Sequence, residues 1–429
     1  MKKISRREFF KSLGGLAAVS DERKRNTDES RTDAGWVRPD LRRGKEVATV
    51  CCECDRGCGV LLTVRDGKVI GYEGDPDHPA NEGFLCEDAE TLFELYTSSG
   101  LHPEKWMPEL LHRPAGADAW EVGDWGNVLR SIARRVKETR DVFFNTKLRQ
   151  AQGIGCIFDH AGLNNEETYL LYKLFKALGV EAGQTGSGQP GVLTFMDHLK
   201  AAGENLFMSW YDSVAGGGAA ADHWLPKPEE VDISGRLQES IFNGLFIWGG
   251  GSLPEEPAGK VLRSIGSLDW LVYVNWFRSE ETFLEEREKI AMACPRSEIF
   301  ILPAAAPWEK TGSLASGGHW VQWCTEAVGP RGQARVPLWI MDRLYRELCE
   351  QYRGDGLFPE PILNLSWDYT GDTLPDVKMV AHEINRDSSS NNGFLGGPTV
   401  PPFSGYWTET EIPSMRRGFG GEWGFKLLR

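Results

Sequence analysis

Apolar side chains recur at helical spacing in two segments of the chain. Asp118–Arg140 brings apolar residues back every three or four positions, which predicts an amphipathic helix with one buried face. The residues on that face are Val128, Leu129, Ile132, Ala133 and Val136. Asn165–Leu178 predicts a second helix. Gly179 follows it directly, and glycine commonly ends a helix because it adopts the left-handed conformation without strain.

Short apolar runs further along the chain predict buried strands. The runs are Ile154–Phe158, Gly244–Gly251, Trp270–Trp276 and Glu298–Leu302. Lys260–Ile265 predicts a helix between the second and third runs. Because strands and helices alternate along the chain, the sequence predicts an α/β fold with a doubly wound parallel sheet.

An alternating pattern nearer the N-terminus predicts a β-hairpin. Val60–Val64 and Lys68–Tyr72 read as its strands, and Arg65-Asp66-Gly67 between them is a favourable turn sequence. Cys51, Cys54 and Cys58 precede the hairpin, and Cys86 follows it. The folded hairpin would therefore bring the fourth cysteine back to the first three.

These cysteines form the strongest chemical signal in the chain. Cys51, Cys54, Cys58 and Cys86 stand at C-x2-C-x3-C-x27-C. Three thiols on a tight loop and one remote thiol suit a [4Fe–4S] cluster, in which each iron takes one cysteine. A structural zinc site is the alternative, but such sites favour two C-x2-C pairs. A register through Cys52 would give C-x-C, which is a poorer chelate.

Composition limits the remaining choices. A chain of 429 residues is long enough for two or three domains. A net charge of −14 argues against nucleic acid as a partner, and no apolar run reaches the ~20 residues that cross a bilayer. The other isolated thiols are expected in the core. They are Cys156, Cys294, Cys324 and Cys349.

The first residues resemble an export signal. Ser5–Lys11 fits the twin-arginine pattern S-R-R-x-F-x-K, which exports proteins that have already folded around a cofactor and predicts a periplasmic location. The apolar stretch Leu13–Val19 is shorter than in ordinary signals, and the cleavage sequence Ala18-Val19-Ser20 is marginal. A basic amphipathic start on a cytoplasmic protein is the alternative.

The cysteine pattern and the sequence that follows it carry a family resemblance. Together with G-K-V-I-G-Y-E-G-D-P-D-H-P-A-N-E-G-F-L-C at 67–86, the pattern resembles the N-terminal [4Fe–4S] domain of molybdopterin oxidoreductases. Within that superfamily the chain is similar to the catalytic subunit of respiratory formate dehydrogenases. The segment P-W-E-K-T-G-S-L-A-S-G-G-H-W-V-Q-W at 307–323 is the most specific of the other matching segments.

The resemblance implies a fold, cofactors and partners. The expected fold is a small β-rich [4Fe–4S] domain joined to doubly wound, Rossmann-like domains. Members bind molybdenum or tungsten on two pterin nucleotides (Mo/W-bis-MGD). Their partners are a ferredoxin-like iron–sulfur β subunit and a membrane cytochrome or quinone subunit. The expected division of this chain is 1–20 signal, 21–46 linker, 47–105 [4Fe–4S] domain, 106–182 α/β segment, 183–240 irregular connection replacing a deleted region, 241–350 α/β domain and 351–429 C-terminal wrap.

Several departures from the family concern its active site. In the family, the segment after the second helix leads to a selenocysteine or cysteine that binds the metal, followed by a histidine. Residues 180–191 contain neither cysteine nor histidine. The chain also stops where the family's C-terminal cofactor cap would begin. Glu87-Asp88 replaces a stretch that commonly carries a lysine, and these acids are expected to lower the cluster potential. Further departures are Ser316, His319 and the Gly249–Leu253 turn.

Three functional hypotheses follow. In the leading one, the chain is a formate dehydrogenase-like electron-transfer subunit that keeps its cluster but has no catalytic residues. In the second, it is an active formate dehydrogenase whose Mo/W-bis-MGD site is completed by another chain. In the third, the four thiols hold zinc and the α/β body is a non-redox scaffold.

Overall fold

The structure is a computed structural model that describes most of the cluster domain and of the α/β body. The described residues are 44–52, 56–87, 89–90, 93, 109–147, 149–158, 163–184, 242–249, 268–276, 291–292, 294–316, 320–370, 375–381, 383 and 426–428. The expected signal, nearly all of the linker and the helix at Lys260–Ile265 lie outside these ranges, as do residues 185–240 of the expected connection.

A small antiparallel sheet forms the cluster domain. Its strands are β1 (Lys45–Val50), β2 (Gly59–Arg65) and β3 (Lys68–Gly74), in the order β1-β2-β3. The predicted hairpin between β2 and β3 is confirmed. Asp66 and Gly67 both have positive φ, at 52° and 71°, as a two-residue type I′ turn requires. The first strand begins at Lys45, so the expected linker ends two residues earlier than its predicted boundary.

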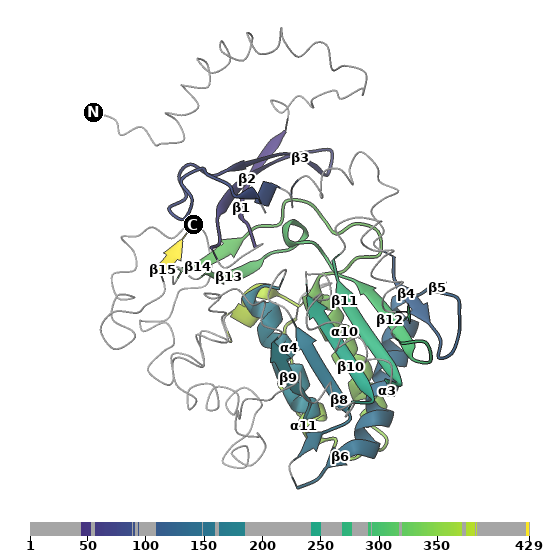
Figure 1. Ribbon diagram of the computed structural model, residues 1–429. Coiled ribbons are helices and arrows are strands. Elements are labelled where there is room, and N and C mark those ends of the chain that lie inside the picture. The colour runs from purple at the N-terminus through teal and green to yellow at the C-terminus, as the bar shows by residue number, and fades with distance from the viewer. Residues whose placement is uncertain are drawn as a thin grey trace, which may run out of the picture.

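A seven-stranded sheet forms the body of the molecule (Figure 1). Its strands, in spatial order, are β5 (Glu121–Val122), β4 (Leu111–Arg113), β12 (Glu298–Pro303), β11 (Trp270–Asn275), β10 (Gly244–Gly249), β8 (Ile154–Phe158) and β9 (Glu181–Gln184). Strands β9, β8, β10, β11 and β12 are parallel. The mixed α/β class and four predicted strands are therefore confirmed, whereas β4, β5 and β9 are additional.

Three helices pack together against one face of this sheet. They are α3 (Trp125–Phe143), α4 (Asn165–Leu178) and α10 (Pro337–Tyr352), and their apolar side chains join those of alternate strand residues such as Phe246 and Val272 in one core. The predicted second helix is confirmed, and Gly179 ends it with a φ of 72°. All five side chains predicted for the buried face of the first helix are buried.

The first helix begins later than the sequence pattern predicted. Asp124 is its N-cap and accepts a hydrogen bond from the amide of Asn127 at 3.1 Å. The preceding residues Glu121 and Val122 instead pair with β4 as strand β5. The predicted start at Asp118 is therefore wrong, because a capping aspartate and a strand pairing compete with the helix there.

The part of the chain after Phe358 enters the core rather than wrapping the surface. The short helix α11 (Glu360–Leu363) buries Ile362 completely. Leu365, Tyr369 and Val380 belong to the same core as α3, α4 and α10. For the described residues of 351–429, the expectation of a surface wrap is therefore wrong.

A second small sheet lies between the cluster domain and the body (Figure 1). Strand β13 (Gly312–Ser316) pairs with β14 (Trp320–Cys324), and β15 (Lys426–Leu428) adds in parallel to β14. The remaining elements are the 3-10 turn η5 (Pro307–Glu309) and the two-residue strands β6 (Phe144–Asn145) and β7 (Gln150–Ala151). No helix within the described residues is long and apolar enough to cross a bilayer.

Candidate metal centre

The first cysteine loop is closed by the ends of two strands. Strand β1 ends at Val50 and β2 begins at Gly59. The amide of Cys51 donates a hydrogen bond to the carbonyl of Cys58 at 2.8 Å, so both residues are held at the neck of the loop. Both are buried. Cys54 lies within this loop but outside the described residues.

The fourth cysteine is brought back by an asparagine clamp. The Asn81 side chain accepts from the amide of Gly59 at 2.9 Å and donates to the Gly59 carbonyl at 3.0 Å. The same side chain donates to the carbonyl of Phe84 at 2.9 Å. These bonds fasten the segment leading to Cys86 to the residue that follows Cys58. The segment that leads to Cys86 is therefore held beside the first residue of β2, and Cys86 itself is exposed.

A histidine and a glutamine join the cysteine loop to the second small sheet. Gln322 on β14 accepts from His78 Nε2 at 2.7 Å and donates to the carbonyl of Gly57 at 2.9 Å. The amide of Ala80 donates to His78 Nδ1 at 3.3 Å, which fixes the neutral tautomer with hydrogen on Nε2. Burial lowers the pKa of His78, so this ring stays neutral and acts as a structural donor.

Tyr72 directs a buried hydroxyl towards the cysteines. Its side chain packs against the small core that contains Cys51 and Cys58, and its hydroxyl finds no hydrogen-bonding oxygen or nitrogen. Burial raises the pKa of Tyr72, and the charges of Cys51, Cys52 and Cys86 raise that pKa further. The hydroxyl therefore stays protonated beside three thiols.

The donor set fits an iron–sulfur cluster chemically. A cluster takes thiolate ligands and accepts hydrogen bonds at sulfur, and this loop offers cysteines with a buried hydroxyl beside them. Among the described residues, which include Cys51, Cys58 and Cys86, no group of three or more histidine, cysteine, aspartate or glutamate side chains is arranged to hold a metal ion. Cys54, one of the four expected ligands, is not among those residues.

Two buried glutamates lie behind the cluster domain. Glu166 accepts from the amide of Ser313 at 2.8 Å and from its hydroxyl at 2.6 Å, and Glu167 accepts from Lys310 Nζ at 2.5 Å. Burial raises the pKa of Glu166 to about 7. Burial also raises the pKa of Glu167 although Lys310 lowers it, and Glu167 Oε1 has no partner.

This polar network was not predicted from the sequence. Asn164 caps α4 in a capping box with Glu167, and N-x-x-E before an apolar run would have revealed that part. The partner Ser313 lies 147 residues further along the chain. No local pattern announces a contact of that range, so Glu166 was indistinguishable from an exposed helix-start acid.

The thiols outside the cluster domain are poor metal ligands. Cys156 is fully buried in β8 and Cys294 is buried before β12. Burial raises the pKa of Cys156 well above its usual value and that of Cys294 to about 12. Burial also raises the pKa of Cys324 to about 12. Since the thiolate is the ligand form, these side chains do not fit a molybdenum or tungsten centre.

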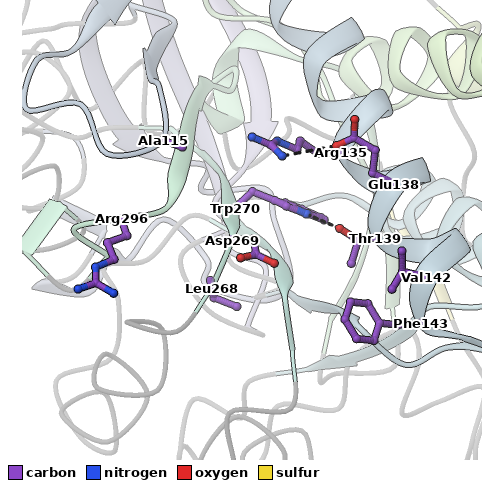
Figure 2. A pocket seen from close by; sticks show the side chains of 10 residues that line it. All are labelled: Ala115, Arg135, Glu138, Thr139, Val142, Phe143, Leu268, Asp269, Trp270 and Arg296. Carbon is purple, nitrogen blue, oxygen red and sulfur yellow. Dashed lines mark hydrogen bonds and ion pairs between the residues drawn. The ribbon is translucent and has the colours of Figure 1, made fainter.

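A hollow lies at the edge of the main sheet where the parallel strands begin. Polar side chains that line it already have hydrogen-bond or ion-pair partners. The hollow measures about 510 Å³ and lies where β11 begins (Figure 2). Arg135 pairs there with Glu298 at 2.5 Å, and Thr139 accepts from the Trp270 indole at 2.9 Å. Parallel sheets bind ligands at their carboxyl edge, and that edge faces the cluster domain through Trp276 and Trp308.

Comparison with known proteins identifies the cysteine region. Residues 44–96 match the molybdopterin oxidoreductase Fe4S4 domain. The chain is 32% identical over 230 residues to formate dehydrogenase 2 subunit alpha (cytochrome c-553) of Nitratidesulfovibrio vulgaris. The matched region covers 52% of this chain and 21% of that protein. It is 28% identical over 232 residues to formate dehydrogenase subunit alpha of Megalodesulfovibrio gigas, with 52% and 21% covered.

More distant similarities extend to other enzymes. The chain is 30% identical over 176 residues to the periplasmic nitrate reductase of Desulfovibrio desulfuricans, covering 40% of this chain and 20% of that protein. Acetylene hydratase from Pelobacter acetylenicus superposes with a TM-score of 0.44 and 11% identity over 87% of this chain and 81% of that one, a level that supports no conclusion. The chain spans about a fifth of the length of these curated relatives.

Proposed function

Because residues 44–96 match the molybdopterin oxidoreductase Fe4S4 domain and the chain is similar to formate dehydrogenase alpha subunits, we propose that it is a formate dehydrogenase-like molybdopterin oxidoreductase that carries a [4Fe–4S] cluster and transfers single electrons. Cys51, Cys54, Cys58 and Cys86 are the proposed ligands. The observation that carries this assignment is the closure of the loop. The amide of Cys51 donates a hydrogen bond to the carbonyl of Cys58, and the Asn81 side chain holds the segment before Cys86 against Gly59.

The position of the domain suits electron transfer. A [4Fe–4S] cluster passes one electron at a time, and its potential follows burial, nearby charge and hydrogen bonds to sulfur. Cys51 and Cys58 are buried, whereas Cys86 and Glu87 are exposed. The proposed cluster would therefore have one side towards the protein and one towards a docking partner.

Formate oxidation by this chain alone is not part of the proposal. That reaction needs a two-electron metal centre with a soft ligand and a cationic group for the anionic substrate. Residues 180–191 hold no cysteine or histidine, and burial keeps the Cys156 and Cys294 thiols protonated. We therefore assign no catalytic residue and no step through Mo/W-bis-MGD.

The finer architecture belongs to the same proposal. The five parallel strands have the spatial order β9-β8-β10-β11-β12, in which the second strand along the chain lies outside the first. This is the 2-1-3-4-5 order of flavodoxin-like doubly wound sheets. We propose that helices cover the second face also, as in the Rossmann-like domains of molybdopterin oxidoreductases. An experimental structure with that face open to solvent would contradict this.

Partners and location follow from the proposed role. A chain that only relays electrons needs a donor and an acceptor, and relatives are named as an alpha or a major subunit. We propose a ferredoxin-like iron–sulfur β subunit and a membrane cytochrome or quinone subunit as partners, in the periplasm. A reporter fused to residues 1–43 should be exported and should stay in the cytoplasm after Arg6→Lys with Arg7→Lys; export of both fusions would contradict the twin-arginine assignment.

Metal analysis of anaerobically purified protein tests the proposed cofactor. We expect about four irons per chain, a reducible cluster by electron paramagnetic resonance and no molybdenum or tungsten. Cys58→Ser should lose most of the iron, whereas Cys349→Ser, in α10, should retain it. Stoichiometric molybdenum or tungsten with formate-dependent dye reduction would favour the enzyme completed by another chain. A colourless protein with one zinc would favour the scaffold.

A further inference from the structure

We propose that the Tyr72 hydroxyl donates a hydrogen bond to the Cys51 sulfur of the [4Fe–4S] cluster and raises the cluster's reduction potential. The inference rests on the proposed function, because it needs an iron-bound thiolate as acceptor. It assigns Tyr72, on strand β3, a role in setting the potential at which the cluster accepts an electron. Tyr72 is thus a positioning residue rather than a ligand.

The Tyr72 hydroxyl has no oxygen or nitrogen acceptor among the residues that the structure describes. Its oxygen is buried and finds no oxygen or nitrogen partner, a state that is unfavourable when nothing compensates it. The side chain packs on the core that contains Cys51, Cys58 and Ala89. Cys51 belongs to the core on which the Tyr72 side chain packs and interacts with it, so its sulfur is the acceptor that we assign to the hydroxyl.

The aromatic ring is held so that the hydroxyl cannot turn away. Phe93 stacks on it with a centroid distance of 4.7 Å and an interplanar angle of 14°. Trp308 contacts the ring from the body, at 5.5 Å and 48°. Since the ring contacts both aromatic side chains, packing from the cluster domain and from the body restricts its orientation.

The charge that the cluster gains on reduction determines whether the hydrogen bond raises or lowers its reduction potential. Reduction adds one negative charge to the cluster, and a hydrogen bond to sulfur is stronger when that sulfur carries more charge. The bond therefore stabilises the reduced cluster more than the oxidised one. A tyrosine hydroxyl ordinarily loses its proton only near pH 10, so at neutral pH it can donate the hydrogen bond in both states.

Potentiometry of the cluster-loaded full chain tests the proposal. Tyr72→Phe removes the hydroxyl and keeps the ring. We expect reduction to become about tenfold less favourable, a fall of about 59 mV for a one-electron couple. The matched control is Tyr345→Phe, whose hydroxyl donates to the Ile362 carbonyl at 3.1 Å in the body core. Its potential should equal that of the wild type.

A vibrational measurement on the wild type decides the question if Tyr72→Phe fails to hold iron. Exchange into D2O should shift an iron–sulfur stretching band in the resonance Raman spectrum, since the proposed donor exchanges its hydrogen. Where Tyr72→Phe does hold its cluster, its shift should be smaller than that of the wild type. Equal potentials in wild type and variant, or no deuterium shift from a cluster-loaded wild type, would overturn the Tyr72 role alone. A wild type without iron would overturn the proposed function as well.

Discussion

Glu166 is an acid that α4 buries where ionisation is costly. Its side chain accepts two hydrogen bonds from Ser313, yet burial dominates and raises its pKa to about 7. Around it lie Glu167, Lys310 and Cys324. One lysine cannot balance both carboxylates, so a proton on Glu166 relieves the excess negative charge in this network.

This raised pKa makes stability depend on pH in a defined direction. A folded-state pKa above the unfolded one means that the folded protein binds the proton more tightly. The contribution is fully present below about pH 4.5 and is lost as pH rises through about 7. Its size is at most on the order of 3 kcal/mol, at 1.36 kcal/mol per pKa unit.

Glu166→Gln should remove this dependence. The amide has nearly the same shape, can still accept from the Ser313 amide and never ionises. We expect the variant to gain stability relative to wild type between pH 5 and pH 8, seen as diverging thermal midpoints by circular dichroism. Glu121→Gln, an exposed change on β5, controls for the loss of a surface charge. Parallel curves for wild type and Glu166→Gln would contradict the assignment.

At the scale of elements, the approach to Cys86 depends on a glycine. Gly59 begins β2, and a Cβ placed there would overlap the ring of His78. Replacing it with alanine must therefore displace His78 or the strand. The displacement would strain both the Asn81 clamp and the His78–Gln322 hydrogen bond.

Gly59→Ala should lower stability and iron content together. Overpacking of this kind costs about 1–3 kcal/mol of folding stability. Here it would occur at Gly59, the residue next to the proposed ligand Cys58. Iron per chain and the thermal midpoint should both fall below wild type. Gly354→Ala is the matched control, because nothing lies within 4 Å of its added Cβ. Full iron content in Gly59→Ala would show that the clamp is not needed for assembly.

The elements that could be predicted are those whose cause is local. The β2–β3 hairpin follows from alternation and Asp66-Gly67, and α4 follows from its period and Gly179. Strand β9 could not be predicted, because Glu-Ala-Gly-Gln at 181–184 has no apolar run. Its place is set by pairing with β8. Similarly, the sequence after Phe358 is rich in proline and polar residues, and only the fold shows that Ile362 and Val380 reach the core.

The candidate site also has features that could be predicted from the sequence and features that could not. The four proposed ligands and the returning hairpin were readable from spacing. Tyr72, Asn81 and Gln322 were not singled out, because their roles depend on which atoms the fold places beside them. Gln322 lies 244 residues from His78. A contact of that range leaves no periodic signal, even though the segment containing Gln322 had the most specific family resemblance.

At the scale of the whole molecule, the cluster domain is fixed to the body by a few polar and aromatic contacts. Gln322 on β14 bonds both to His78 and to Gly57 in the cysteine loop. The hydroxyl of Thr49 accepts from the amide of Thr325 at 3.2 Å, and Trp308 meets Tyr72. The orientation of a proposed cluster relative to the main sheet therefore depends strongly on Gln322.

Gln322→Ala should loosen the cluster domain without unfolding the body. It leaves the buried His78 Nε2–H and the Gly57 carbonyl without this partner, at a cost of about 1–3 kcal/mol for each unsatisfied group. Hydrogen exchange on the full chain should become faster in β1, β2 and the segment 75–86, while amides of β10–β12 keep their protection.

Gln333→Ala separates this effect from the loss of any glutamine that bonds to the backbone, and Gln333 is partly buried. Gln333 also makes two backbone contacts, accepting from the amide of Leu110 and donating to the carbonyl of Gly123, each at 3.0 Å. Those contacts lie within the body, so its faster exchange should appear around β4 and the start of α3. If Gln322→Ala leaves exchange in the cluster domain unchanged, Gln322 does not hold the two parts together. The remaining contacts, which include Thr49–Thr325, Tyr72–Trp308 and the apolar packing of Leu62 and Val69 on Trp276, would then be sufficient to orient the domain.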